Sequence, residues 1–137
     1  MMFENPPDET VKELLTQSKT IAVVGLSTKE IRPSYQVAKY LQDMGFQVFP
    51  VNPAAREILG EKVYPGLADI PVDIDIVDVF RRSEHVPDIA KAAIDIGAKA
   101  LWLQEGVIHD ESAHLAQKSG LTVLQDICIK KVGLRLL

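Results

Sequence analysis

Thr20-Ile-Ala-Val-Val-Gly25 is a short, uninterrupted apolar run that ends in glycine. Such a run is typical of a strand that is buried on both faces of a parallel sheet. After the next loop, residues 33–44 repeat apolar side chains at i, i+3, i+4 and i+7, which predicts a helix. Pro33 suits the first turn of this helix, and Gly45 suits its end.

The rest of the chain repeats this alternation. We expect further long strands at 46–51, 74–80, 100–103 and 121–124, and helices at 83–96 and 110–119. The prediction also includes a leading helix within 1–19, a short helix at 54–59 and a very short strand at 62–64. Strands that alternate with helices predict right-handed crossovers and a parallel sheet. We therefore predict one α/β domain over residues 1–137, Rossmann-like and three-layered (α/β/α), with a mainly parallel sheet. Its long strands run in the order 2-1-3-4-5, and the short strand adds at the edge beyond the second.

Length and composition exclude several classes of protein. The chain has 137 residues, 47% hydrophobic and 25% charged, as expected for one ordinary globular domain. No apolar run approaches the roughly 18 residues of a membrane span, and the acidic N-terminus resembles neither a secretory nor a transit peptide. The net charge of −4 argues against nucleic-acid binding. With a single cysteine, Cys128, an internal disulfide is excluded, so we expect a cytoplasmic protein without nucleic-acid or membrane partners.

Ligands of open parallel sheets bind beyond the carboxyl ends of the strands, where the strand order reverses. The loops at those ends are 25–32, 52–56, 81–83, 104–109 and 126–131. The first loop leads into a helix N-terminus, whose free N–H groups and positive dipole end suit a phosphate. The same edge carries four cations, Lys29, Arg32, Arg56 and Arg81, near the acids Glu30, Glu57 and Glu105. Any one cation alone is better explained as a solvated loop charge, but the group favours an anionic ligand.

The dinucleotide-binding fingerprint G-x-G-x-x-G is missing, because Gly25 is followed by Leu26 and Ser27 without a second glycine in register. The second strand ends in Val51-Asn52-Pro53, where an NAD site has an acid for the ribose. A Walker A loop is also absent. The obvious ligand of this fold, NAD, is therefore disfavoured.

Four strand-end motifs occur together: Ala22-Val-Val-Gly-Leu-Ser27, Val48-Phe-Pro-Val-Asn-Pro53, Val79-Phe-Arg81 and Leu101-Trp-Leu-Gln-Glu-Gly106. With Cys128 after the last strand, their order resembles the CoA-binding domain family. This Rossmann-like domain also forms the N-terminal part of the succinyl-CoA synthetase alpha subunit, and the resemblance covers about residues 15–130. The synthetase needs a second domain with a phosphorylated histidine, which this sequence does not show, so we expect a CoA-binding module and not a ligase.

The resemblance implies coenzyme A or an acyl-CoA as the ligand. It implies that the 25–29 loop and the helix start at 33–34 hold phosphates, that 52–56 flank the nucleotide, and that 80–81 line the cleft. Residues 104–105 would lie along the path of the ligand. The expected cofactor-binding residues are Gly25, Leu26, Ser27, Thr28, Lys29, Arg32, Pro33, Ser34, Asn52, Pro53, Arg56, Phe80, Arg81, Gln104 and Glu105.

Cys128 allows two interpretations. Its place at the ligand edge, beside Lys130 and Lys131, suggests a thiol contact such as a mixed disulfide with CoA. The simpler interpretation is a small buried apolar residue, which we favour because free cysteines are commonly buried.

The sequence shows no catalytic constellation and no metal-ligand pattern. His109 and His114 are five residues apart, not the i, i+4 pair of a helical metal site. Asp78 lies within an apolar strand, which predicts a buried structural carboxyl with a hydrogen-bond partner. We expect a non-catalytic CoA carrier, regulator or subunit, with a protein partner or a homodimer left open. The alternatives are an NAD(P)-binding oxidoreductase and a regulatory interaction module with a vestigial nucleotide site.

Overall fold

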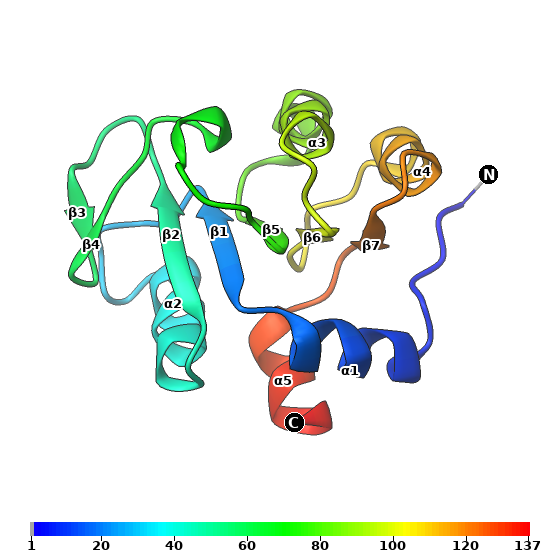
Figure 1. The fold of residues 1–137 in the computed structure, drawn as a ribbon, viewed down its shortest axis with the longest axis horizontal. Coiled ribbons are helices and arrows are strands. Elements are labelled where there is room, and N and C mark those ends of the chain that lie inside the picture. Colours follow the sequence, from blue (N-terminus) through cyan, green and yellow to red (C-terminus); the bar gives the residue numbers. More distant parts are fainter. Residues whose placement is uncertain (1) are drawn as a thin grey trace.

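The computed structural model describes residues 2–137 and contains a five-stranded parallel sheet (Figure 1). Its strands are β1 (Thr20–Val24), β2 (Gln47–Val51), β5 (Ile76–Val79), β6 (Ala100–Leu103) and β7 (Thr122–Leu124). They lie in the order β2-β1-β5-β6-β7, and every neighbouring pair is parallel. This is the predicted order of the five long strands, so the Rossmann-like prediction is confirmed.

Helices cover both faces of the sheet (Figure 1). The helices are α1 (Asp8–Gln17), α2 (Pro33–Asp43), α3 (Val86–Asp95), α4 (Asp110–Lys118) and α5 (Ile129–Leu136). Helices α3 and α4 lie on one face, and α1, α2 and α5 lie on the other. Two short 3-10 helices, η1 (Leu67–Asp69) and η2 (Ser83–His85), precede β5 and α3. None of the helices in residues 2–137 is long and apolar enough to cross a membrane.

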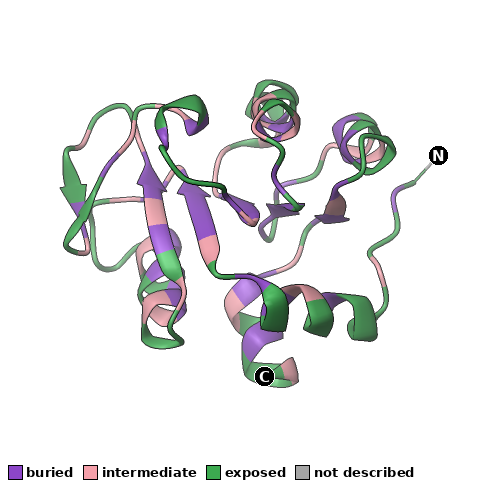
Figure 2. Ribbon diagram, viewed as in Figure 1, coloured by how far each residue is buried: buried purple, intermediate pink, exposed green. Residues whose placement is uncertain are grey.

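The sheet is buried along its length because each central strand contributes apolar side chains to both faces (Figure 2). In β1, Ala22 and Val24 join the core under α3 and α4, whereas Ile21 and Val23 join the core under α1, α2 and α5. This explains why the run at 20–24 is continuous and not alternating. The two cores hold the carboxyl ends of β1, β2 and β5 at one edge.

The prediction of a short helix at 54–59 is wrong. These residues begin a hairpin of β3 (Glu57–Ile58) and β4 (Glu61–Lys62), which forms a separate two-stranded sheet. Its turn consists of Leu59 and Gly60, both with positive φ (55° and 76°). This is the conformation of a two-residue hairpin turn, and it outweighs the helix propensity of the preceding residues. The short edge strand is reduced to one parallel bridge between Val51 and Tyr64.

Two further details of the chain ends differ from the prediction. The loop expected at 126–131 ends early, because α5 begins at Ile129. Gly133 lies inside this helix, where a β-carbon would collide with the hydroxyl of Tyr40 on α2, so the glycine allows the two helices to pack closely. At the other end, α1 begins after Pro7 and has no side-chain cap in the described part of the chain, so the capping box of Thr10 and Glu13 is not formed.

Asp75, at the amino edge of the sheet, joins β1 to β5. Its Oδ2 accepts hydrogen bonds from the backbone N–H groups of Lys19 (2.7 Å) and Thr20 (3.2 Å), and its Oδ1 lies 3.3 Å from Nζ of Lys99. Partial burial raises the pKa of Asp75, but these hydrogen bonds and the charge of Lys99 lower it further, so the net shift is downward. Because the folded-state pKa is depressed, the carboxylate stabilises the fold above its unfolded pKa.

Replacement of Asp75 by alanine is expected to cost about 2 kcal/mol of unfolding free energy at pH 7, because the backbone N–H groups of Lys19 and Thr20 lose a charged acceptor. The stabilisation should disappear as the pH falls through the depressed folded-state pKa, so wild type and variant should converge in acid. Urea unfolding at pH 7 and pH 3 measures both effects. Asp73→Ala, which removes a neighbouring exposed carboxylate, is the control. A constant difference between wild type and D75A at both pH values would contradict this account.

Candidate functional site

Gly25 brings the ends of β1 and β5 into close contact. Its φ is +85°, and a β-carbon there would lie 2.9 Å from Cδ of Arg81 and 3.0 Å from the carbonyl oxygen of Phe80. Its N–H donates to the carbonyl of Val51 at 3.0 Å, which also ties it to β2. Glycine is therefore required here by both conformation and space. This contact lies between β1 and β5, where the order of the strands along the sheet reverses.

A hollow of about 310 Å³ lies beside Gly25, at the N-terminus of α2. It is lined by Gly25, Ser27, Lys29, Arg32, Pro33, Ser34 and Phe80, and we call it the α2 hollow. All seven are among the residues expected from the sequence. No side chain in residues 2–137 caps the N-terminus of α2, and its first turn holds no acid. The helix therefore presents a positive dipole end and backbone donors next to two cationic side chains.

Hydroxyl groups shape the loop that forms the α2 hollow. The backbone N–H of Ser27 donates to Oγ of Ser34 at 3.0 Å, and the N–H of Lys29 donates to Oγ of Ser27 at 3.0 Å. Ser34 is buried, so the first of these bonds fixes the loop against the start of α2. The loop is thus ordered by its own hydrogen bonds, and Lys29 is exposed at its tip.

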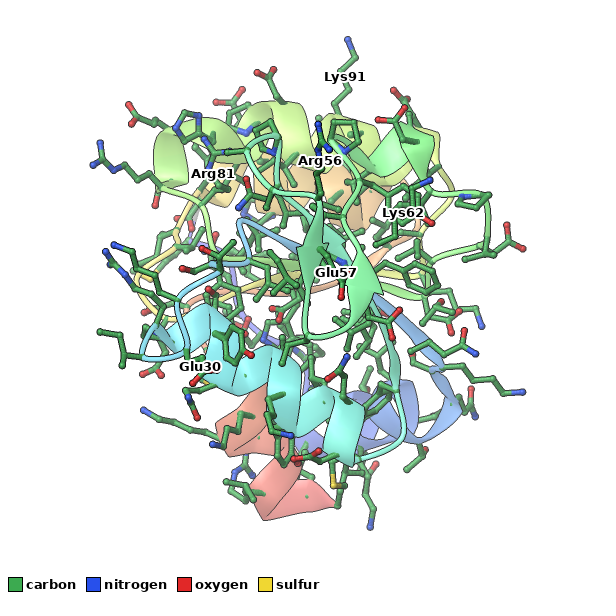
Figure 3. The ribbon with its side chains drawn as sticks, turned by 90° about the vertical axis from the view of Figure 1, so that its left-hand side faces the viewer. Glu30, Arg56, Glu57, Lys62, Arg81 and Lys91 are labelled. Atoms are coloured by element: carbon green, nitrogen blue, oxygen red, sulfur yellow. The ribbon has the colours of Figure 1, made fainter. Side chains whose placement is uncertain are left out.

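A second hollow, of about 290 Å³, lies on the opposite face of the sheet at the same edge. It is mostly apolar, and we call it the α3 hollow. Its lining comprises Val24, Val51, Pro53, Pro65, Gly66, Leu67, Arg81, His85, Asp88, Ile89 and Ala92. Arg81 lines this hollow and also packs against Gly25 of the α2 hollow, so it lies at the boundary of the two. Figure 3 shows Arg81 at the same edge of the molecule as the loop that carries Glu30.

The sequence identified only part of the α3 hollow. Pro53 and Arg81 were expected, whereas Pro65, Gly66 and Leu67 come from the segment around η1 and were missed. The hairpin that precedes these residues was expected to be a helix. No sequence pattern therefore indicated where the segment around η1 lies. The signal that could have found Ile89 is its place on a helix that begins at the ligand edge.

Several of the expected binding residues have structural roles and do not line either hollow. Leu26 is fully buried in the core. Asn52 donates to the carbonyl of Leu26 at 3.0 Å and accepts from the N–H of Ala54 at 2.8 Å, so its side chain ties two loops together. Gln104 is 3% exposed, and its Oε1 accepts from the N–H of Ile129 at 3.0 Å, at the start of α5. These three residues shape the edge without presenting a side chain to either hollow.

Three other expected residues, Thr28, Arg56 and Glu105, are not part of the lining of either hollow. Arg56 precedes the β3–β4 hairpin and projects upward from it in Figure 3. Glu105 forms an ion pair with Lys131 at 2.9 Å, and this hydrogen bond raises the pKa of Lys131. Thr28 is exposed in the loop but is not part of the lining of the α2 hollow.

Cys128 is buried, with 8% of its surface exposed, and it immediately precedes α5. The structure therefore shows the buried apolar residue that the simpler interpretation requires. His85 borders the α3 hollow. Within residues 2–137, no group of three His, Cys, Asp or Glu side chains is arranged to hold a metal ion.

Comparison with known proteins gives close relatives of two kinds. An uncharacterised Bacillus subtilis protein, YneT, is 43% identical over 128 residues, which cover 93% of this chain and 95% of YneT. A hypothetical protein from Pyrococcus horikoshii has a solved structure that matches with a TM-score of 0.92 and 38% identity, and the match covers 98% of this chain and 99% of that chain. The ADP-forming acetate–CoA ligase II of Archaeoglobus fulgidus is 32% identical over 96 residues, which cover 67% of this chain but only 14% of the ligase.

A family profile described as the CoA binding domain matches residues 19–133, from the start of the sheet into α5. The matched segment includes both hollows at the carboxyl edge. The chain belongs to the CoA-binding domain family.

Proposed function

We propose that this protein binds coenzyme A or an acyl-CoA at the carboxyl edge of its sheet and acts as a non-catalytic carrier, regulator or subunit. The observation that carries the proposal is the pair of adjacent hollows that meet at Gly25 and Arg81. One is polar and cationic at a helix N-terminus, and the other is mostly apolar. CoA has parts that match them. Its pyrophosphate suits the cationic hollow, and its adenosine, which carries a further phosphate, has a flat base that suits the apolar one.

The pyrophosphate is assigned to the α2 hollow. Backbone donors at a helix N-terminus bind phosphate oxygens, and Lys29 and Arg32 supply compensating charge. An anion suits these groups, because the first turn of α2 contains no acid that would neutralise them.

The adenosine is assigned to the α3 hollow, which lies at the ends of β1 and β2, where α/β folds of this kind place that half of a dinucleotide. Ile89 and Leu67 supply apolar surface for a flat base. Arg81 lies at the boundary, within reach of either phosphate group. A ribose contact of the NAD type is disfavoured, because the side chain of Asn52, at the end of β2, is already hydrogen-bonded to the backbone of Leu26 and Ala54.

The ligands of the related ligases support CoA as the ligand, but the ligase reaction is not carried over, since the chain matches only 14% of that relative's length. A cytoplasmic location and a protein partner or second copy remain parts of the proposal. The cytoplasmic location rests on the single cysteine, which suits a reducing compartment.

CoA and acetyl-CoA are expected to raise the unfolding temperature, whereas NAD, NADP and ATP should do so weakly or not at all. At a hundredfold excess over Kd, the ligand should add about 2.7 kcal/mol to the unfolding free energy. Differential scanning fluorimetry with the five ligands measures this. A shift with NAD and none with CoA would overturn the proposal.

Lys29→Ala should then weaken CoA binding about fivefold to tenfold, because a charge-assisted contact to phosphate is lost. Lys12→Ala is the matched control, since Lys12 is an exposed lysine on α1, away from both hollows. Equal affinity of wild type and K29A in titration calorimetry would remove Lys29 from the site.

A further inference from the structure

A third hollow lies at the end of β7, and the proposed function leaves it unused. It has a volume of about 320 Å³ and lies between the N-terminal segment and the loops that follow β6 and β7. Phe3 and Ile108 contribute apolar surface, and Asp110 and Asp126 contribute carboxylates. We call it the β7 hollow.

Hydrogen bonds fix the walls of the β7 hollow. Nδ2 of Asn5 donates to the carbonyl of Gln125 at 3.0 Å, and Oδ1 of Asn5 accepts from the N–H of Gln125 at 2.8 Å. The side chain of Gln125 donates to Oδ1 of Asp110 at 2.7 Å. Phe3 is buried against the core. The N-terminal segment, which passes beside β7 and α4 in Figure 1, is therefore a fixed wall of the hollow.

A pantetheine arm that starts at the α2 hollow is long enough to reach the end of β7 along the carboxyl edge of the sheet. In dinucleotide-binding folds, the second half of the ligand crosses the reversal point towards the strands on its other side. Here these strands are β5, β6 and β7, so β7 lies three strand spacings of about 4.8 Å from β1, or ~14 Å. The pantetheine arm has about twelve chain bonds, the length of about four extended residues, which is also ~14 Å.

We infer that the β7 hollow receives the acyl group of an acyl-CoA and selects short, uncharged acyl chains. This inference rests on the proposed function. Ile108 is 48% exposed and offers apolar surface beside the hollow. Oδ1 of Asp126 accepts from the N–H of Gly106 at 2.7 Å, which holds this carboxylate in place. An acyl chain that ends in a carboxylate would meet Asp110 and Asp126 as like charges, so the hollow disfavours it.

Titration calorimetry on the full chain with CoA, acetyl-CoA, butyryl-CoA and succinyl-CoA tests this inference. Butyryl and succinyl groups have the same number of carbons and differ in charge. We expect acetyl-CoA and butyryl-CoA to bind at least as tightly as CoA, and succinyl-CoA to bind about tenfold more weakly than butyryl-CoA.

Asp126→Asn removes one charge and keeps the geometry. Asp126 has φ +60°, a conformation that asparagine tolerates, and the amide oxygen can still accept from Gly106. The variant should reduce the ratio of the succinyl-CoA Kd to the butyryl-CoA Kd about threefold to tenfold. Asp95→Asn, an exposed carboxylate at the end of α3, controls for net charge.

The outcomes separate the two proposals. Equal binding of butyryl-CoA and succinyl-CoA, or an unchanged ratio in D126N, would overturn the acyl site while CoA binding stands. Absence of binding by every CoA species would overturn both.

Discussion

Asp78→Val is expected to increase the unfolding free energy at pH 8 by at least about 2 kcal/mol, because a buried polar group without a hydrogen-bond partner is removed. For a chain of this length, the unfolding temperature should rise by about 5 °C or more. Most substitutions in a core destabilise a protein, so a gain at a fully buried position would be a specific result.

The reason lies in the position of Asp78 in the sheet. It is paired with Val23 on one side and Trp102 on the other, both of which face the core under α2 and α5. It is 0% exposed, and neither carboxyl oxygen has a hydrogen-bond partner in residues 2–137. The partner expected from the sequence is therefore not present. Valine has the shape that a central parallel strand accommodates.

The pH dependence of the effect follows from the pKa. Burial raises the pKa of Asp78 well above its usual value, so the folded state retains a proton that the unfolded state releases above about pH 3.9. The contribution of Asp78 to stability therefore declines as the pH rises from the unfolded pKa to the folded pKa, by roughly 1.4 kcal/mol per pH unit. D78V should lose this decline, and its advantage over wild type should grow between pH 5 and pH 8.

Urea unfolding of wild type, D78V and D78N at pH 5 and pH 8 measures these differences. Asp78→Asn keeps the size and the polarity but cannot ionise, so it should remove the pH dependence without the full stabilisation. If wild type and D78V responded equally to pH, Asp78 would not be a protonated buried carboxyl.

The sheet could be predicted because a strand that is buried on both faces appears in the sequence as a continuous apolar run. The run at 20–24 contributes to both cores, and glycine stops at 45, 97 and 120 mark helix ends with positive φ. The α2 hollow could also be predicted, since all of its lining except Phe80, which follows β5, comes from one loop and the helix that follows it.

The remaining features depend on contacts between distant segments. The hairpin at 57–62 is formed by residues with helix propensity, and its Leu59-Gly60 turn shows only in the backbone. The α3 hollow is lined by residues of β1, η1 and α3, and no local sequence pattern predicts that these three elements lie together. Asn52 and Gln104 were identified correctly as strand-end residues, but the hydrogen bonds that occupy them come from the packing of other loops.

Gly25→Ala is expected to weaken CoA binding by at least about tenfold and to cost about 1–3 kcal/mol of unfolding free energy. Two causes act together. A non-glycine residue at φ +85° is strained, and the new methyl group lies 2.9 Å from Cδ of Arg81 and 3.0 Å from the backbone of Phe80. The side chain of Arg81 can move, but the Phe80 carbonyl belongs to the end of β5, so the two loops must separate.

Gly45→Ala separates these causes. Gly45 has φ +96°, and in the described part of the chain nothing lies within 4 Å of its would-be β-carbon. It follows α2 at the amino edge of the sheet, so it should share the backbone strain and retain CoA affinity. Titration calorimetry of both variants, at a temperature where circular dichroism shows them folded, measures the difference. Wild-type affinity in G25A would show that the contact between Gly25 and Arg81 does not form the CoA site, because the proposed ligand crosses the sheet at this contact.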